Sequence, residues 1–193
     1  KSAVENAQAY FERYEKAKAA SAEIPALIRK ARYELAYLDQ LETDLDLASN
    51  RPEIDEVRSA LIEGGYAPRK RHTQMQRGQP LRLTSPDGLP ILVGRSARQN
   101  HEITFHQAAA DDLWLHAVDL PGAHVIVKAG GQEVQQASLE RAAELAAYYS
   151  AARGEGQVLV AYTERRYVRP IRGAGPGMVT YRNEETIAVT ARA

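Results

Sequence analysis

The strongest constraint on the fold is a seam of residues that recurs at alternating steps of four and three positions through the start of the chain. All its members except Ser21 and Glu42 are apolar or aromatic, and the repeat continues for about five heptads, which is typical of a coiled-coil helix. We expect one helix from about residue 5 to residue 48, roughly 65 Å long, with a kink at Pro25, which has no backbone N–H. The members of the seam are Tyr10, Tyr14, Ala17, Ser21, Ile24, Ile28, Ala31, Leu35, Leu38, Glu42 and Leu45.

A second, shorter helix is predicted directly after the first. Pro52 lies near its first turn, Glu53 favours its N-terminus, and Gly64 ends it. This helix is too short to cover the seam. The partner helix must therefore come from sequence before Lys1 or from another copy of the chain, and a start within a helical pattern suggests a piece of a longer protein.

The rest of the chain lacks the long helical periodicity of residues 1–66. Residues 67–79 lack periodicity and are basic, which indicates a linker. From residue 80 onward, strand-like runs precede and follow one strong helix at Ala137–Arg153. The sequence therefore predicts an α+β protein: a helical arm over residues 1–66 and a domain over 80–193 with a mostly antiparallel sheet and one main helix.

The formal net charge is zero, yet the two parts differ in sign. Residues 1–66 contain 9 Lys and Arg against 13 Asp and Glu, whereas residues 67–193 contain 16 against 12. This asymmetry favours a polyanionic partner for the second part. There is no cysteine, which excludes disulfides and Cys-ligated zinc, and no apolar run is long enough to span a membrane. We expect a cytoplasmic protein.

Several long motifs resemble the NFACT family. The stretches VGRSARQNHEITF, DLWLHAVDLPGAHVIV, AAELAAYYSAAR and VAYTERRYVRPIRGAGPGMVTY are similar in order and spacing to its NFACT-R domain, and the arm is similar to the returning helix of its central coiled coil. Two departures are Ser96, where Asn is commoner, and Gly175, where Lys usually precedes Pro-Gly.

The resemblance implies a role in ribosome-associated quality control. Members bind a large ribosomal subunit obstructed by peptidyl-tRNA and recruit tRNA, so that a C-terminal tail, alanine in bacterial members, is added without a template. The ribosome makes the peptide bond. Expected partners are therefore the large subunit, tRNA and rRNA. Because some members carry the name fibronectin-binding protein, a surface adhesin that binds an extracellular matrix protein is the alternative.

Candidate RNA-binding residues follow from side-chain chemistry together with this resemblance. Arg, Gln and Asn supply most hydrogen bonds to phosphates and base edges, and exposed aromatic rings stack on bases. In the last basic run, strand alternation places Arg165, Tyr167 and Arg169 on one face. The candidates are Arg95, Arg98, Gln99, Asn100, Trp114, His116, His124, Lys128, Arg165, Arg166, Tyr167, Arg169 and Arg172.

His116 and His124 decide whether a metal site is plausible. A turn at Pro121–Gly122 with Leu120 opposite Ala123 places the two histidines on opposite faces, whereas a loop of odd length places them on one face. No third ligand has a recognisable spacing. Trp114 and His116 share a face and form either a half-buried anchor or an exposed patch that stacks on a base. We find no enzyme signature and expect no metal, cofactor or nucleotide hydrolysis.

Overall fold

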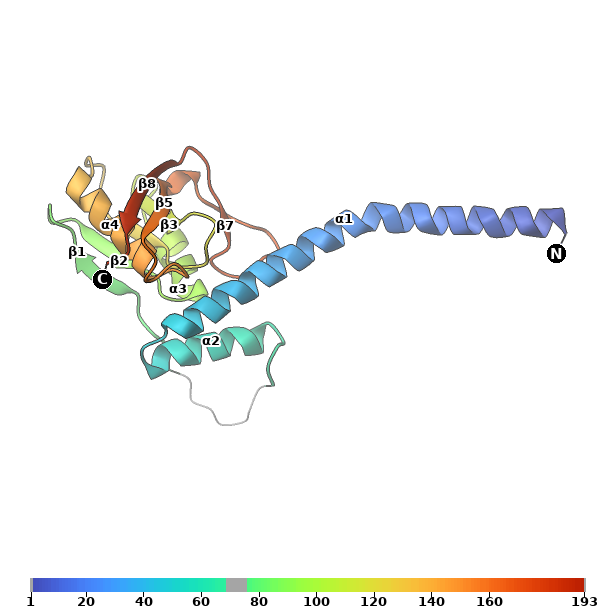
Figure 1. Ribbon diagram of the computed structural model, residues 1–193, viewed down its shortest axis with the longest axis horizontal. Coiled ribbons are helices and arrows are strands. Elements are labelled where there is room, and N and C mark those ends of the chain that lie inside the picture. Colours follow the sequence, from blue (N-terminus) through green and yellow to red (C-terminus); the bar gives the residue numbers. More distant parts are fainter. Residues whose placement is uncertain (1, 69–75, 193) are drawn as a thin grey trace.

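The computed structural model describes residues 2–68 and 76–192, and Arg69, Lys70 and Arg71 of the predicted linker lie outside them. It is an α+β protein in which a long helix extends from a compact domain (Figure 1). The helical elements are α1 (Ala3–Leu47), α2 (Arg51–Glu63), α3 (Ala97–Glu102), η1 (Ile103–Gln107), α4 (Gln136–Tyr148) and η2 (Arg165–Tyr167). The strands are β1 (Leu81–Thr84), β2 (Pro90–Val93), β3 (Leu113–Ala117), β4 (Val125–Val127), β5 (Gln157–Glu164), β6 (Arg169–Pro170), β7 (Val179–Thr180) and β8 (Glu185–Thr190).

Helix α1 forms the predicted arm as one continuous element. Its first turn is capped by Ser2 and Glu5, whose side chains and backbone N–H groups bond reciprocally. Pro25 lies inside the helix without ending it, and Figure 1 shows the helix change direction along its length. No helix is long and apolar enough to cross a membrane in the part of the chain that the structure describes.

Leu38 packs beside the cluster between α1 and α2, but most of the seam is not paired within the described residues, so the arm is not shown to be a coiled coil. Leu35 and Leu45 remain 61% and 48% exposed. At its end α1 instead packs on α2 through a neighbouring stripe, in which Leu41 and Val57 are each 3% exposed and contact Ala97 of α3. The contacts with α2 and α3 thus lie on the side of α1 that includes Tyr37 and Leu41.

The domain contains a six-stranded antiparallel sheet in the order β1-β2-β4-β3-β5-β8. The predicted hairpin around Pro86-Asp87-Gly88 is confirmed as β1 and β2, with Leu81 opposite Val93. Helix α4 covers one face, where its alanines and Leu145 pack on Leu115 and other inward side chains of the sheet. This face is the main core of the domain.

The other face of the sheet is a second core rather than a solvent-exposed surface. Trp114 and Ile126 are fully buried there, with Leu92, Ile103 and Val168. The covering layer consists of α3, η1 and the segment from η2 to β7. The prediction that Leu115 and Trp114 face opposite ways is confirmed, but the possibility of an exposed Trp–His patch is wrong because a second layer covers this face.

The last basic run does not continue as a strand. Strand β5 ends at Glu164, and residues 165–167 form a 3-10 turn, so the predicted alternation of Arg165, Tyr167 and Arg169 on one strand face is wrong. The glycine-rich stretch connects β6 to β7, as expected for a link between strands. There Gly175 packs against the arm so closely that an added Cβ would lie 2.3 Å from the ring of Tyr37.

We expect the exposed seam of α1 to drive self-association. Ile24 and Ile28 are each about half exposed, and burial of such a side chain contributes roughly 1.5–3 kcal/mol. Sedimentation should therefore detect a dimer, and Ile28→Glu with Leu35→Glu should produce monomers.

The matched control for the seam variant is Ala19→Glu with Ala26→Glu. These exposed positions have the same spacing and gain the same charge on the opposite side of the helix. The control should remain a dimer. A wild-type chain that sediments as a monomer at tens of micromolar, with its arm helical, would contradict the prediction.

Candidate nucleic-acid interface and the pocket beside the arm

The motif SARQN, Ser96–Asn100, forms the start of α3 and is mostly buried. Ser96 caps the helix by accepting a hydrogen bond from the Gln99 backbone, and its hydroxyl donates to Glu56 of α2. The Gln99 side-chain amide also donates to Glu56 at 3.0 Å. The Asn100 amide donates to the Gly122 carbonyl at 2.9 Å. Gln99 and Asn100, predicted as RNA contacts, are therefore committed to internal hydrogen bonds.

The two arginines of this region differ completely in environment. Arg95 pairs with Glu53 of α2 at 2.5 Å, and the Glu53 side chain is only 4% exposed. This ion pair and hydrogen bonds from Ser49 outweigh the burial of Glu53, so the pKa of Glu53 is lowered. Arg98 is exposed and forms no ion pair among the described residues. Of the two, only Arg98 is free to contact a partner.

The buried contacts between α1–α2 and the domain form a polar junction centred on Gly122. Gln40 of α1 accepts a hydrogen bond from the Gly122 N–H at 2.9 Å and donates to its carbonyl at 3.2 Å. Asp44 accepts from the backbone N–H of Ala97 at 2.8 Å. Burial raises the pKa of Asp44 to about 7, although its hydrogen bonds with Gln40 and Ala97 act in the opposite direction.

The register of β3 and β4 brings the two histidines together. Leu113 pairs with Val127 and Leu115 with Val125, so one further step places His116 opposite His124 on the same face. Their rings stand edge to face with centroids 5.3 Å apart. Of the two loops that the sequence left open, the one of odd length, which places both histidines on one face, is therefore confirmed.

The longer turn has two visible causes. Asp119 adopts a left-handed backbone conformation with φ of 55°. Gly122 is drawn away from the ladder, toward Gln40, Asn100 and a bridge to Ser150. The connection between β3 and β4 is consequently longer than a tight Pro-Gly turn.

Both histidines are held in the neutral form. Burial lowers the pKa of His116 to about 4, and interactions with the Gly122 and Ala117 backbone oppose this only in part. Burial, followed by the neighbouring His116, also lowers the pKa of His124 well below its usual value. His124 is 2% exposed, and its Nδ1 lies 2.8 Å from the Thr104 hydroxyl. No group of three His, Asp or Glu side chains is arranged to hold a metal ion within residues 2–68 and 76–192.

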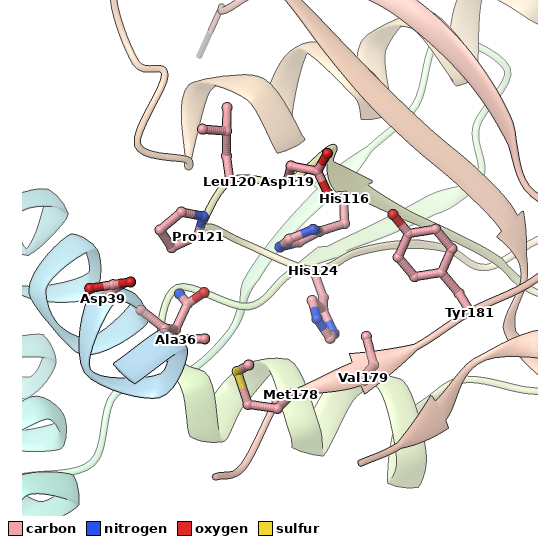
Figure 2. Close-up of a pocket in the computed structure, with 12 residues that line it drawn as sticks. Ala36, Asp39, His116, Asp119, Leu120, Pro121, His124, Met178, Val179 and Tyr181 are labelled. Atoms are coloured by element: carbon pink, nitrogen blue, oxygen red, sulfur yellow. The ribbon is translucent and has the colours of Figure 1, made fainter. Parts of the chain in front are cut away.

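A pocket of about 380 Å³ opens beside these histidines, between the arm and the domain. Figure 2 shows His116 and His124 on one side, Met178, Val179 and Tyr181 on another, and Ala36 and Asp39 on α1. Asp119, Leu120 and Pro121 of the β3–β4 turn complete the wall. Apart from the histidines, none of these residues was predicted from the sequence.

Two other basic residues that were predicted to contact RNA, Lys128 and Arg165, bond to groups inside the domain instead. Lys128 pairs with the buried Asp112 at 2.5 Å and donates to the Gln107 carbonyl at 2.8 Å. Arg165 donates to the Thr104 carbonyl at 2.7 Å and lies over the ring of Phe105. Burial lowers the pKa of Arg165, and the nearby Arg169 adds to this effect. Both side chains support the layer that covers Trp114.

The remaining basic candidates gather on the β6–β7 hairpin and the residues next to it. Arg169 and Arg172 are exposed, and Arg182 lies over the ring of Tyr167 at 5.8 Å. None of these three arginines forms an ion pair among the described residues, whereas Arg166 pairs with Glu164 at 2.5 Å. We call Tyr167, Arg169, Arg172 and Arg182 the hairpin surface. Arg182 was not predicted, although a Tyr-Arg pair that ends a strand run is a recognisable signal for one inward and one outward side chain.

This arrangement can be compared with known proteins. Residues 1–80 match the NFACT N-terminal and middle domains, and residues 80–182 match the NFACT protein RNA binding domain. The chain belongs to the NFACT family. The predicted resemblance is thereby confirmed.

Relatives within the NFACT family include the Rqc2 homolog RqcH of Bacillus subtilis (strain 168), which is 42% identical over 191 residues. The alignment covers 96% of this chain and 33% of that protein. The Rqc2 homolog RqcH of Streptococcus suis (strain 05ZYH33) is 40% identical over 188 residues, 96% of this chain and 34% of the relative. The chain thus spans about a third of the length of these relatives.

A solved structure has the same fold. It is described as the C-terminal of the fibronectin/fibrinogen-binding protein from Streptococcus suis, and it superposes with a TM-score of 0.89 at 38% sequence identity. The match covers 100% of this chain and 77% of that one. The arm and the domain are therefore both present in a relative of known structure.

The contrast between Arg95 and Arg98 in this NFACT chain is testable by denaturation. Arg95→Ala leaves Glu53 buried without its ion-pair partner, which costs roughly 3–5 kcal/mol of unfolding free energy for a buried pair. Arg98→Ala, at an exposed position in the same motif, should change that free energy by less than about 0.5 kcal/mol. Equal effects of the two substitutions in urea titrations would show that the Arg95 pair does not hold the junction.

A second test concerns acid stability. In the unfolded chain an imidazole takes up a proton near pH 6.5, but folded His116 does so only near pH 4. The folded state therefore loses stability as pH falls from 6.5 toward 4, by roughly 3 kcal/mol in total, and this contribution is absent above pH 6.5. We expect His116→Gln to lose less stability between about pH 7 and about pH 4.5 than the wild type.

The control for acid stability is His106→Gln, which replaces an exposed histidine and should follow the wild type. Urea titrations at several pH values give the comparison. Parallel pH profiles for wild type and His116→Gln would contradict the assignment of a buried neutral imidazole.

Proposed function

We propose that this chain is the ribosome- and tRNA-binding part of a cytoplasmic quality-control factor. In this role it binds large ribosomal subunits obstructed by peptidyl-tRNA and supports template-free alanine tailing of the stalled chain. It contributes no catalytic group, because the ribosome makes the peptide bond. The match to the NFACT protein RNA binding domain and the identity to RqcH proteins support this proposal.

The observation that carries the proposal is the hairpin surface. Arg169, Arg172 and Arg182 are exposed without ion-pair partners among the described residues, and Tyr167 lies beside them. Guanidinium groups bind phosphates in bidentate fashion, and a tyrosine ring provides a face for base stacking. Arg165, two residues before Tyr167, is fixed by its hydrogen bond to the Thr104 carbonyl.

Binding should depend steeply on salt, because each phosphate contact releases counterions. Filter binding of tRNA and co-sedimentation with large subunits should weaken from about 50 to about 200 mM salt. The variant Arg169→Ala, Arg172→Ala, Arg182→Ala should bind at least about tenfold more weakly, and removal of each arginine that neutralises a phosphate should reduce the salt slope by about 1. Subunits that carry peptidyl-tRNA should bind the wild type better than empty subunits.

The matched control is Arg153→Ala with Arg192→Ala. Both arginines are exposed, but Arg153 lies against Tyr148 of α4 and Arg192 pairs with Glu144 of α4, so they belong to the covered side of the sheet opposite Trp114. This control should bind tRNA within about twofold of the wild type. Salt-independent binding, or equally weakened binding in both variants, would refute an RNA-binding hairpin surface.

The adhesin alternative is favoured by one observation, the matching structure of a fibronectin/fibrinogen-binding protein. Immobilised fibronectin and fibrinogen, presented in parallel with tRNA, separate the two proposals. We expect capture of tRNA and large subunits. Capture of the matrix proteins with no RNA binding at low salt would favour the adhesin.

A further inference from the structure

The pocket between the arm and the domain has a chemistry opposite to that of the hairpin surface. No Lys or Arg is among the described residues that line it. Its rim instead contains two exposed carboxylates, Asp39 of α1 and Asp119 of the β3–β4 turn, and neither forms an ion pair with another described residue. Such a rim repels phosphate and accepts hydrogen bonds from N–H groups.

The inner wall is formed by imidazole rings. His124 is 2% exposed, its Nδ1 lies 2.8 Å from the Thr104 hydroxyl, and the Asn100 backbone also interacts with its ring. Figure 2 shows the His124 ring on the same side of the pocket as His116. Two neutral imidazoles that line one pocket wall supply ring nitrogens that can pair with a polar ligand atom.

The flanks of the pocket suit a flat ring. Tyr181 and Met178 lie on the β7 side, and Leu120 and Pro121 lie on the turn side. A volume of about 380 Å³ is at the small end of the range for ligand pockets. Aromatic and apolar walls with few polar groups typically orient one planar ligand.

The pocket and the hairpin surface share a wall. Tyr181 lines the pocket and the next residue, Arg182, belongs to the hairpin surface. Thr180 of β7 pairs with Arg169 of β6. The two neighbours of Thr180 in sequence, Val179 and Tyr181, both line the pocket. A strand of RNA whose backbone lies on the arginines would therefore have a base within reach of the pocket.

We propose that this pocket binds a single amino-bearing nucleobase, adenine or cytosine, turned out of an RNA strand held by the hairpin surface. The presence of an RNA strand on the hairpin surface rests on the proposed function. The binding of a free base in the pocket does not depend on it. The exocyclic amine donates to the rim carboxylates, the ring lies against Tyr181, and an imidazole nitrogen of the inner wall contacts a ring atom. Uracil places a carbonyl where the amine is needed and is discriminated against.

Free nucleosides test the pocket without phosphates. Adenosine, cytidine and uridine are titrated into the chain and followed by NMR chemical shifts of the histidine ring protons. We expect adenosine or cytidine to bind at least about tenfold more tightly than uridine, with little salt dependence because the ligand is uncharged. Substitution of both rim carboxylates, Asp39→Asn with Asp119→Asn, should reduce this preference to less than about threefold.

A pocket-filling variant separates the pocket from the hairpin surface. Ala36→Tyr places a ring into the pocket from α1 and should abolish nucleoside binding while salt-dependent tRNA binding falls by no more than about threefold. Ala26→Tyr, an exposed position on the same helix away from the pocket, is the control and should behave as the wild type.

Three results would overturn the proposal: no nucleoside binding, equal binding of uridine, or displacement of the nucleoside by spermidine, which would identify a site for cationic amines. The arginine variants test the hairpin surface independently, since nucleosides carry no phosphate. Loss of tRNA binding in those variants together with retained adenosine binding would support both assignments.

Discussion

One residue, Gly122, connects the arm, α3 and the segment after α4. Gln40 of the arm bonds to both its N–H and its carbonyl, and Asn100 of α3 bonds to the same carbonyl. On its other side Gly122 bridges to Ser150 after α4, where an added Cβ would lie 2.7 Å from the serine Cβ. Only glycine allows these approaches. The orientation of the arm, the lengthened β3–β4 turn and the facing histidines all depend on them.

Around Gly122, buried carboxyl groups join the arm to the domain beside the small apolar cluster of Leu41, Val57 and Ala97. Asp44, Glu53 and Glu56 of α1 and α2 are buried against N–H and guanidinium donors of the SARQN region. Part of the excess of acidic residues in residues 1–66 is therefore explained by the carboxyl groups that bond to the domain where α1 ends and α2 follows. Because desolvated carboxylates are costly without partners, the junction tolerates only a docking in which every one of them is bonded.

The sequence predicted the elements better than their contacts. The long helix, the hairpin at Pro86–Gly88 and the faces of β3 follow from local periodicity, and each is confirmed. The length of the loop between His116 and His124 stayed open at the sequence level, because it depends on contacts with residues far away in sequence, such as Gln40. Local patterns do not contain such long-range hydrogen bonds.

Some of the predicted RNA-binding residues are exposed and others are buried, and local patterns do not distinguish the two groups. A count of Arg, Gln and Asn cannot distinguish Arg95, which neutralises Glu53, from Arg98, which faces solvent. Trp114 was expected on the face opposite the main core, but only the fold shows that a second layer covers it. The carboxylates of the pocket rim come from Asp39 and Asp119, which belong to separate parts of the chain, so no motif could link them.

The contact between Gly175 and Tyr37 holds the arm near its base. The β6–β7 connection touches α1 near its base, while the remaining helix extends toward Ser2 without further support from the described residues. From Tyr37 to the start of α1 the helix is roughly 50 Å long, so a rotation of about one degree at this contact moves the far end by about 1 Å. The direction of the arm, and with it the position of its tip, is therefore set by a few side chains at the contact with the domain.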